Sequence, residues 1–446
     1  MDAPHYRLSI TTPSTWLVAA AFVLTLGVYR VPTPVGYNAT FYHLLLGGAL
    51  YFGVLAFFAG AMRLHLAPRT RGVVVSFILY AAYSFILLLK NLVVIQPNNL
   101  SNYLSEMMGY VLLFAAILLV DTFPTFRRTV AAFLASNVFL YLGAFWHLYN
   151  FAAFGRIVTG VPFWRQPEGE FVNRDISFMG FPRLRLPFST PSDAGVYLSL
   201  TGILFLALVL HRMSRREGRN GLLLTVLFLN FLCLIGTMAR ASWSVFLLGG
   251  VVVFSRYRSV VHVRLRYVVV PIVAGIILLS LLANTLPVVN EALHFAALRF
   301  DPQAMRGDNK VHLMTRLLAL HYWEESPLWG LGIGGFSLKP GAGVHTHSTY
   351  FTILVERGLI GLFLYLLFFA MLYRMLLGAL RDARNRGDWE RVPYLVGFLG
   401  GLTGLAVGNL LYQMWPEYVS FFFGLGIACV NTMPEGKKPS EVSPAT

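Results

Sequence analysis

The chain has 446 residues and a formal net charge of +15, with 57% hydrophobic and only 12% charged residues. Because soluble domains contain about 25% charged residues, this composition excludes an ordinary soluble protein. The basic residues lie in short segments between apolar runs, so we expect membrane lipid, and no nucleic acid, as the surrounding partner. Cys233 and Cys429 both lie inside apolar runs, which argues against a disulfide framework or a zinc site.

Apolar runs long enough to span a bilayer recur along the chain. Such a helix needs about 20 residues, and we predict about twelve of them. The predicted spans are 14–29, 41–62, 72–89, 103–120, 129–153, 189–211, 221–236, 241–255, 267–286, 348–373, 392–411 and 417–433. The expected fold class is therefore an all-α integral membrane protein.

Alternate short loops between these spans are basic, which predicts the orientation. One set holds 18 arginines, in 63–71, 127–128, 211–219, 255–266 and 374–391, whereas the opposite set holds only Arg30, Lys90 and Arg240. We therefore expect the first set and both termini in the cytoplasm.

Two longer segments fall on the other, extracytoplasmic side. The expected organisation is spans one to nine in 1–286 with a loop at 154–188, a large loop at 287–347, spans ten to twelve in 348–433, and a cytoplasmic tail at 434–446. Residues 311–325 have leucines and aromatics at helical spacing, which predicts a helix on the membrane surface or over the bundle. Long loops in compact proteins usually have a functional role.

Four arginines gather on the side that should be poor in them: Arg183, Arg185, Arg240 and Arg316. Each alone is equally well explained as an interfacial anchor that reaches the lipid headgroups. Together they indicate a site, because a guanidinium offers a planar fork of donors to phosphate oxygens. A lipid-linked diphosphate would suit such a cluster at the membrane surface.

The order His347, Ser348, nine residues, Gly358, two residues, Gly361 resembles the signature of O-antigen ligases. RLLALHYWEESPLWGLGIGGF (316–336) resembles the segment that precedes this histidine in the wider ligase and polymerase superfamily. RLRLPFSTPSDAG and TMARASW resemble its two shorter arginine-bearing motifs. One departure is Thr190-Pro191-Ser192, where relatives often have an Asn-Pro-Asn-like element. The resemblance extends over 180–430 and is strongest over 316–361.

The resemblance implies a GT-C-like bundle that transfers O-antigen polysaccharide from undecaprenyl diphosphate to lipid A–core, without a cofactor or metal. His347 is then the expected general base, and direct displacement would invert the anomeric centre. The alternative for His347 is an interfacial or helix-capping histidine. His345 and Ser348 are expected as supporting neighbours, and Glu417 either orients an arginine or the histidine, binds sugar, or is an interfacial charge.

Other interpretations stay open beside this one. An O-antigen polymerase or a protein O-oligosaccharyltransferase would use the same donor, and a secondary transporter is a different class, although transporters place ionisable residues within their spans. His345 and His347 have no third metal ligand at suitable spacing, so no metal site is expected. GLGIGG (330–335) matches a nucleotide-binding pattern, but without a strand–turn–helix context it is interpreted as a tight turn against the bundle.

Overall fold

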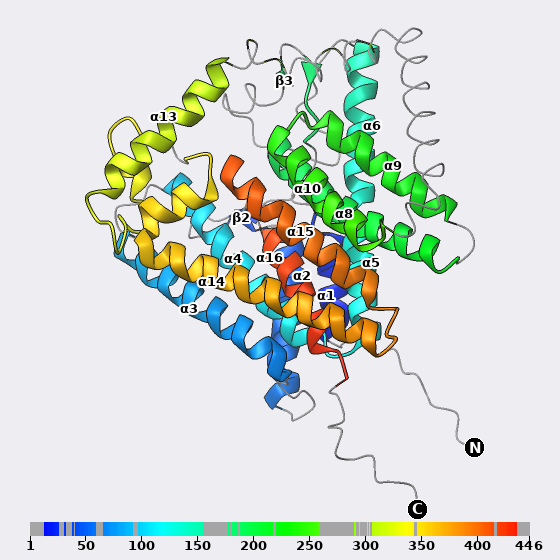
Figure 1. The fold of residues 1–446 in the computed structure, drawn as a ribbon. Coiled ribbons are helices and arrows are strands. Elements are labelled where there is room, and N and C mark those ends of the chain that lie inside the picture. The colour runs from blue at the N-terminus through cyan, green and yellow to red at the C-terminus, as the bar shows by residue number, and fades with distance from the viewer. Residues whose placement is uncertain are drawn as a thin grey trace, which may run out of the picture.

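The protein folds mainly into helices (Figure 1). The computed structural model describes residues 13–25, 31–32, 38–39, 41–58, 66–91, 97–154, 177–178, 181–185, 188, 190–216, 220–258, 290, 294, 301, 303, 306–342, 346–413 and 417–434. His345, the predicted span 267–286, the tail from 435 onward and most of the loop 154–188 lie outside these residues.

Thirteen α-helices in the described residues build the bundle. The first half of the chain forms α1 (Pro13–Phe22), α2 (Phe41–Phe58), α3 (Pro68–Asn91), α4 (Pro97–Leu119), α5 (Phe123–Ala135) and α6 (Asn137–Phe154). The second half forms α8 (Pro191–Ser214), α9 (Gly221–Gly236), α10 (Arg240–Arg256), α13 (Arg306–Trp323), the 3-10 helix η1 (Phe336–Leu338), α14 (Thr349–Asn385), α15 (Val392–Leu411) and α16 (Glu417–Asn431). Two small antiparallel hairpins pair β1 (Val31–Pro32) with β2 (Asn38–Ala39), and β3 (Ser177–Phe178) with β4 (Phe181–Pro182).

Five stretches of helix are long and apolar enough to cross a membrane, among the described residues and with α5 and α6 taken as one. Five further apolar helices are shorter. The prediction of a helical membrane protein is thus confirmed, whereas the number of twelve spans stays a prediction. The predicted bounds 221–236 and 392–411 coincide with α9 and α15, and the helix expected at 311–325 is present as α13.

α8 lies at the centre of the bundle and is buried along nearly its whole length. Thr190 caps its first turn by accepting a hydrogen bond from the backbone N–H of Asp193 at 3.1 Å, and Pro191 occupies the first turn, where its missing N–H costs nothing. α10 and α15 pack against α8 and against each other. Close approach is possible because Gly249 and Gly400 face each other; a Cβ on either would lie 2.8 Å from the other's carbonyl oxygen.

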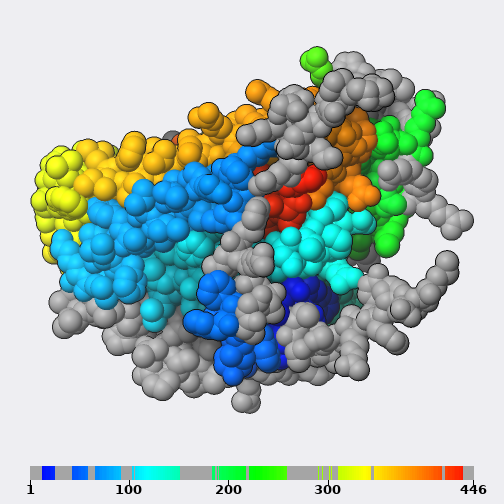
Figure 2. Space-filling model, turned by 90° about the horizontal axis from the view of Figure 1, so that it is seen from below, coloured from blue at the N-terminus to red at the C-terminus, as the bar shows by residue number. Residues whose placement is uncertain are grey.

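The outer surface of the bundle is apolar, as a lipid environment requires. Large side chains on the outward face of α3 are more than half exposed at Val75, Phe85 and Ile86. α3 lies beside α14 (Figure 2). Phe363 of α14 is also largely exposed. In water such a surface would be an aggregation hazard, whereas in a bilayer it needs no cover.

Arginines and their partners gather at one end of the bundle, which we call the basic end. It contains ion pairs between Arg69 and Asp382, Arg127 and Glu390, and Arg391 and Asp388, and a hydrogen bond from Arg386 to the Pro434 carbonyl. These residues come from the N-terminal parts of α3 and α5, the end of α14, the connection between α14 and α15, and the residues that follow α16. The described parts of the predicted basic loops therefore meet in space.

Several arginines assigned to these loops lie on helices instead. α14 continues to Asn385, so Arg374, Arg381 and Arg384 are helical, and Arg127 and Arg128 lie in α5. Hydropathy ends a predicted span where charges begin, but a helix with satisfied backbone hydrogen bonds can extend beyond the apolar layer. The loop assignment of these five arginines is corrected accordingly, as is that of Arg69 and Arg71 in α3, Arg212 in α8 and Arg256 in α10.

Candidate active site

A cavity of about 720 Å³ opens at the end of the bundle opposite the basic end. Its walls come from the N-terminal ends of α8 and α10, the first half of α13, the approach to α14 and the end of α15. The lining residues that bear on its chemistry are Arg183, Thr190, Ser192, Met238, Arg240, His312, Arg316, His347 and Tyr412. Four of the predicted site residues, Arg183, Arg240, Arg316 and His347, are thus brought together from segments far apart in the sequence.

The turn between α9 and α10 holds two of these arginines in place. The backbone N–H of Leu184 donates to the Gly236 carbonyl at 2.8 Å, and Arg183 Nε donates to the Thr237 carbonyl at 3.2 Å. Met238 has a φ of 51°, a left-handed conformation that is uncommon for a residue with a side chain. This tight turn brings Arg240, the first residue of α10, to the cavity wall.

α13 contributes His312 and Arg316, which are four residues apart and so lie on one face of the helix. Nη2 of Arg316 donates to the His347 carbonyl at 3.1 Å and to the Leu411 carbonyl at 3.2 Å. Its Nε is buried and has no hydrogen-bond partner among the described residues. Burial lowers the pKa of Arg316 from its ordinary value, but an arginine stays protonated in proteins. It therefore presents a charged, partly unused donor group.

His347 stands directly before α14, in a strained conformation. Its φ is 56°. Three non-glycine residues in the described chain have positive φ, and two of them, Met238 and His347, line the cavity. Such strain is often found at functional sites. The imidazole of His312 contacts the His347 ring edge-on with centroids 4.2 Å apart, and the Tyr412 ring lies at 6.4 Å.

Ser348 anchors the start of α14 to α15. Its buried hydroxyl donates to the Asn409 carbonyl at 3.1 Å, while Thr349 donates to the Asn409 side-chain oxygen at 3.0 Å. Thr346 donates to the Ser348 carbonyl at 2.8 Å. Ser348 does not line the cavity, so the structure places it as a support for the backbone that positions His347.

The cavity is electropositive. Three arginines line it, and no aspartate or glutamate does so among the described residues. The N-terminal ends of α8 and α10 also face it, and a helix N-terminus has partial positive charge and unpaired N–H groups. Among the described residues no group of three or more His, Cys, Asp or Glu side chains forms a metal cluster. The arrangement suits an anion with several phosphate oxygens.

Two other predicted site residues, Arg185 and Glu417, are not part of this cavity wall. Arg185 is 2% exposed and is electrostatically coupled to His147 of α6. Oε1 of Glu417, at the start of α16, lies 3.5 Å from Nε2 of His43 of α2. His345 lies outside the described residues. The sequence places Arg185 next to Arg183 but does not show that only Arg183 faces the cavity.

His312 and Tyr412 line the cavity without having been predicted as site residues. The signal for His312 was present, because a histidine four residues before Arg316 on a helix must share its face. Tyr412 had no such signal, since its place depends on how α15 ends beside α13 and α14. The donors at the N-termini of α8 and α10 were also missed, because only the fold makes two helix ends converge.

The fold and this cavity define an integral membrane protein with a basic, histidine-containing site at one end of a helical bundle. Residues 224–366 match the family model described as O-antigen ligase, and this match supports membership of the O-antigen ligase superfamily. The matched segment contains Arg240, Arg316 and His347, and it ends within α14. No curated protein matches the chain.

Proposed function

We propose that this protein transfers O-antigen polysaccharide from undecaprenyl diphosphate to lipid A–core in lipopolysaccharide assembly. The superfamily implies polymeric glycan and lipid-linked substrates in general terms. The observation that supports the specific proposal is the shared cavity of His347 with Arg183, Arg240 and Arg316. A proton acceptor and an anion clamp in one cavity are what glycosyl transfer from a diphosphate donor requires.

In the proposed reaction the acceptor sugar hydroxyl attacks the anomeric carbon of the donor glycan. The new glycosidic C–O bond forms as the bond to the diphosphate oxygen breaks, and the lipid diphosphate leaves with the bonding electron pair. His347 accepts the hydroxyl proton, so that charge does not build up on the attacking oxygen. Attack opposite the leaving group inverts the anomeric centre.

The arginines would stabilise the charge that develops on the departing diphosphate. Arg183 is fixed by its bond to the Thr237 carbonyl, and Arg316 by its bonds to the His347 and Leu411 carbonyls. Because these donors are held before the reaction, little reorganisation is needed in the transition state. We keep Arg185 as a proposed substrate-binding residue, because it is buried and lies two residues after Arg183 in the chain. Glu417, which lies close to His43, is assigned a structural role.

The proposed location is the bacterial inner membrane, with a GT-C-like bundle, both termini in the cytoplasm and the cavity on the periplasmic side. The basic end supports this orientation, since cytoplasmic ends are rich in arginine. The donor lipid would enter sideways between helices, and its diphosphate would lie at the level of the headgroups.

The test is transfer by the purified full-length protein, with undecaprenyl-diphosphate-linked glycan and lipid A–core, in the presence of a metal chelator. Glycan on lipid A–core from the wild type, and its loss in His347→Ala, is the expected result. Glycan that lengthens on its own lipid carrier would identify a polymerase instead, and transfer to a protein would identify an oligosaccharyltransferase. Absence of any product with active substrates would overturn the transferase proposal in favour of transport.

A further inference from the structure

α14 is broken at its tenth residue, Gly358. Gly358 has φ 64° and ψ −168°, which is not helical, so Thr349–Arg357 forms a separate half-helix whose N-terminus follows His347. A residue with a side chain would be strained here, and its Cβ would lie 2.2 Å from the Leu328 carbonyl oxygen. The break leaves backbone groups that need partners, because no water is available in a bilayer core.

The loop that follows α13 supplies these partners. The N–H groups of Leu331 and Gly332 donate to the carbonyls of Val355 and Glu356, both at 2.9 Å. In return, the N–H of Leu359 donates to the Pro327 carbonyl at 2.9 Å, and that of Ile360 to Leu328 at 3.2 Å. The loop backbone approaches the helix most closely at Gly330, where a Cβ would lie 2.4 Å from the Glu356 carbonyl oxygen, and Gly330, Gly332 and Gly334 all have positive φ. α13 and the half-helix are thereby joined into one unit.

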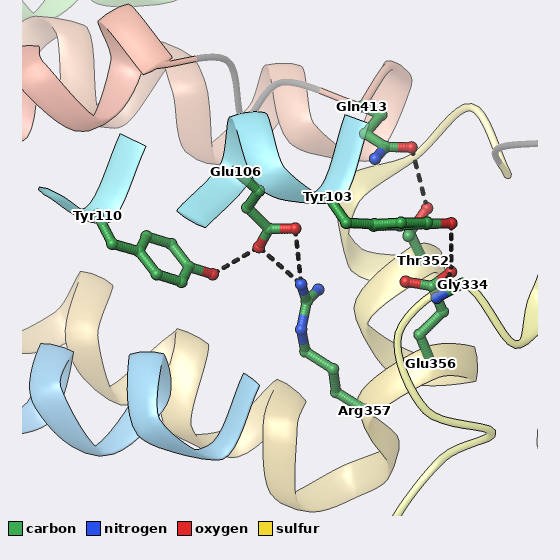
Figure 3. Close-up of polar contacts among 8 residues, drawn as sticks. All are labelled: Tyr103, Glu106, Tyr110, Gly334, Thr352, Glu356, Arg357 and Gln413. Atoms are coloured by element: carbon green, nitrogen blue, oxygen red, sulfur yellow. Dashed lines mark hydrogen bonds and ion pairs between the residues drawn. The ribbon is translucent and has the colours of Figure 1, made fainter. Parts of the chain in front are cut away.

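Two charged residues of α14 beside the break, Glu356 and Arg357, are fully buried and bonded to α4 (Figure 3). Nη2 of Arg357 donates to both carboxylate oxygens of Glu106, at 2.6 and 2.7 Å. Tyr110 donates to the same carboxylate at 2.5 Å. Glu356 accepts from the Gly334 N–H at 3.0 Å and from the Tyr103 hydroxyl at 3.3 Å.

α3 adds two uncharged contacts on the other side of the break. The Tyr83 hydroxyl lies 3.0 Å from the Arg357 carbonyl and 3.2 Å from the Trp329 carbonyl, and it donates between them. Asn91 Nδ2 donates to the carbonyls of Leu331 and Ile333, both at 3.1 Å. The break is therefore held from α3 and α4, neither of which lines the cavity.

Charged groups are costly in a membrane and usually have a function there. Glu106 and Arg357 do not line the cavity, so they have no direct part in the proposed chemistry. They do fix one end of a half-helix of roughly 13.5 Å, and His347 stands at the other end. Arg316, in the same α13–loop unit, is bonded to the His347 carbonyl. Any shift of the half-helix would therefore change the relation between the histidine and the arginine clamp.

We propose that the Glu106–Arg357 ion pair is a positioning device that holds the broken helix so that His347 meets the bound diphosphate donor. This inference rests on the proposed function for the identity of the donor. Glu106 and Arg357 are positioning residues, which act on the reaction only through the backbone of the half-helix.

The test compares wild type with Glu106→Gln, using hydrogen–deuterium exchange of the purified full-length protein and steady-state transfer kinetics. Amide exchange over 349–357 should rise by at least about tenfold, because one buried charge loses its partner, while exchange over 392–411 should not change. kcat should fall by about a hundredfold, as expected for a displacement near 1 Å. KM for the donor should change far less, since Arg183 and Arg240 lie on other elements.

A double variant separates positioning from simple stability. Glu106→Gln/Arg357→Gln removes both charges of the pair, while Glu356 keeps its donors Gly334 and Tyr103, so its Tm should return toward that of the wild type while kcat stays low. Recovery of kcat together with Tm would overturn the proposal, as would unchanged exchange over 349–357 in Glu106→Gln. Arg127→Gln, which breaks the exposed ion pair at the basic end, is the matched control and should change neither kcat nor amide exchange over 349–357. If wild type transfers no glycan, the proposed function fails, but the exchange data still decide whether the pair holds the half-helix.

Discussion

Arginines gather at both ends of this bundle, but their surroundings differ. At the basic end Arg69, Arg127 and Arg391 each pair with a carboxylate, so their charge is neutralised within the protein. In the cavity Arg183 and Arg316 bond to backbone carbonyls, and no carboxylate lines the wall among the described residues. A carbonyl orients a guanidinium without cancelling its charge, so Arg316 keeps positive charge for a ligand.

The number of arginines therefore does not identify a site. The groups to which the arginines bond, carboxylates or backbone carbonyls, are more informative. Exposed ion pairs such as Arg127–Glu390 contribute little to stability. Arginines that converge on a cavity without carboxylates are poised for an anion.

Replacement of His347 should have the largest effect of any cavity substitution. His347→Ala should lower kcat by about 10²–10⁴-fold, because the proton of the acceptor hydroxyl would lose its acceptor. KM for the donor should change little. The measurement is steady-state transfer with labelled donor glycan. His321→Ala, on the exposed side of α13, is the matched control and should keep wild-type kinetics; equal losses in both variants would remove His347 from the reaction.

Loss of a cavity arginine should affect the transition state nearly as strongly. Arg316→Ala should lower kcat by about 10²–10³-fold, the usual cost of removing one donor that stabilises developing charge. Arg316→Lys should recover only part of this loss, because lysine keeps the charge but not the planar fork. Transfer kinetics of both variants give the comparison. Full activity of the alanine variant would show that this arginine is only an anchor.

Two glycines of α14 should respond in opposite directions to the same substitution. Gly358→Ala should cost more than about 2 kcal/mol of unfolding free energy, because of its positive φ and the close Leu328 carbonyl. Gly378→Ala should stabilise by about 0.5–1 kcal/mol, since nothing lies within 4 Å of the added Cβ in a regular helix. Thermal unfolding in detergent measures both, and similar Tm values would argue against the helix break.

Substitution at the basic end should have the smallest effect. Arg127→Gln breaks an ion pair whose side chains are 57% and 70% exposed, so the expected loss of unfolding free energy is about 0–1 kcal/mol. Transfer kinetics should not change, because this end is remote from the cavity. A large rise in donor KM in this variant would contradict the assignment of separate roles to the two ends.

Much of the helical framework was predictable because apolar runs are a local signal. α9 and α15 have the predicted bounds, and α13 was expected from its periodicity alone. The start of α14 was predicted to within one residue, but its end was not, since its last turns are basic, and neither was the break at Gly358. The glycine spacing in GLGIGG (330–335) predicted a turn. It did not predict that this loop completes the backbone hydrogen bonds of α14 at its break.

The candidate site was predictable in part. The four residues that line the cavity were chosen because they are polar groups on one expected side of the membrane. Arg185 and Glu417 met the same criterion, yet Arg185 is buried beside the cavity wall residue Arg183 and Glu417 lies close to His43. Which neighbour faces inward depends on the packing of α6 and α8, and hydropathy does not contain that information.

The sequence alone indicated a helical membrane protein that resembles O-antigen ligases over residues 224–366, with His347 and several arginines at the ends of apolar helices. Those features depend on residue type and short spacing, which are properties of the chain alone. Only the tertiary structure decided that three arginines meet this histidine in one cavity, and that Glu106 and Arg357 pair across 251 positions of sequence. Convergence of this kind results from packing between distant segments, because burying a charge in the bundle is favourable only where its partner is already in place.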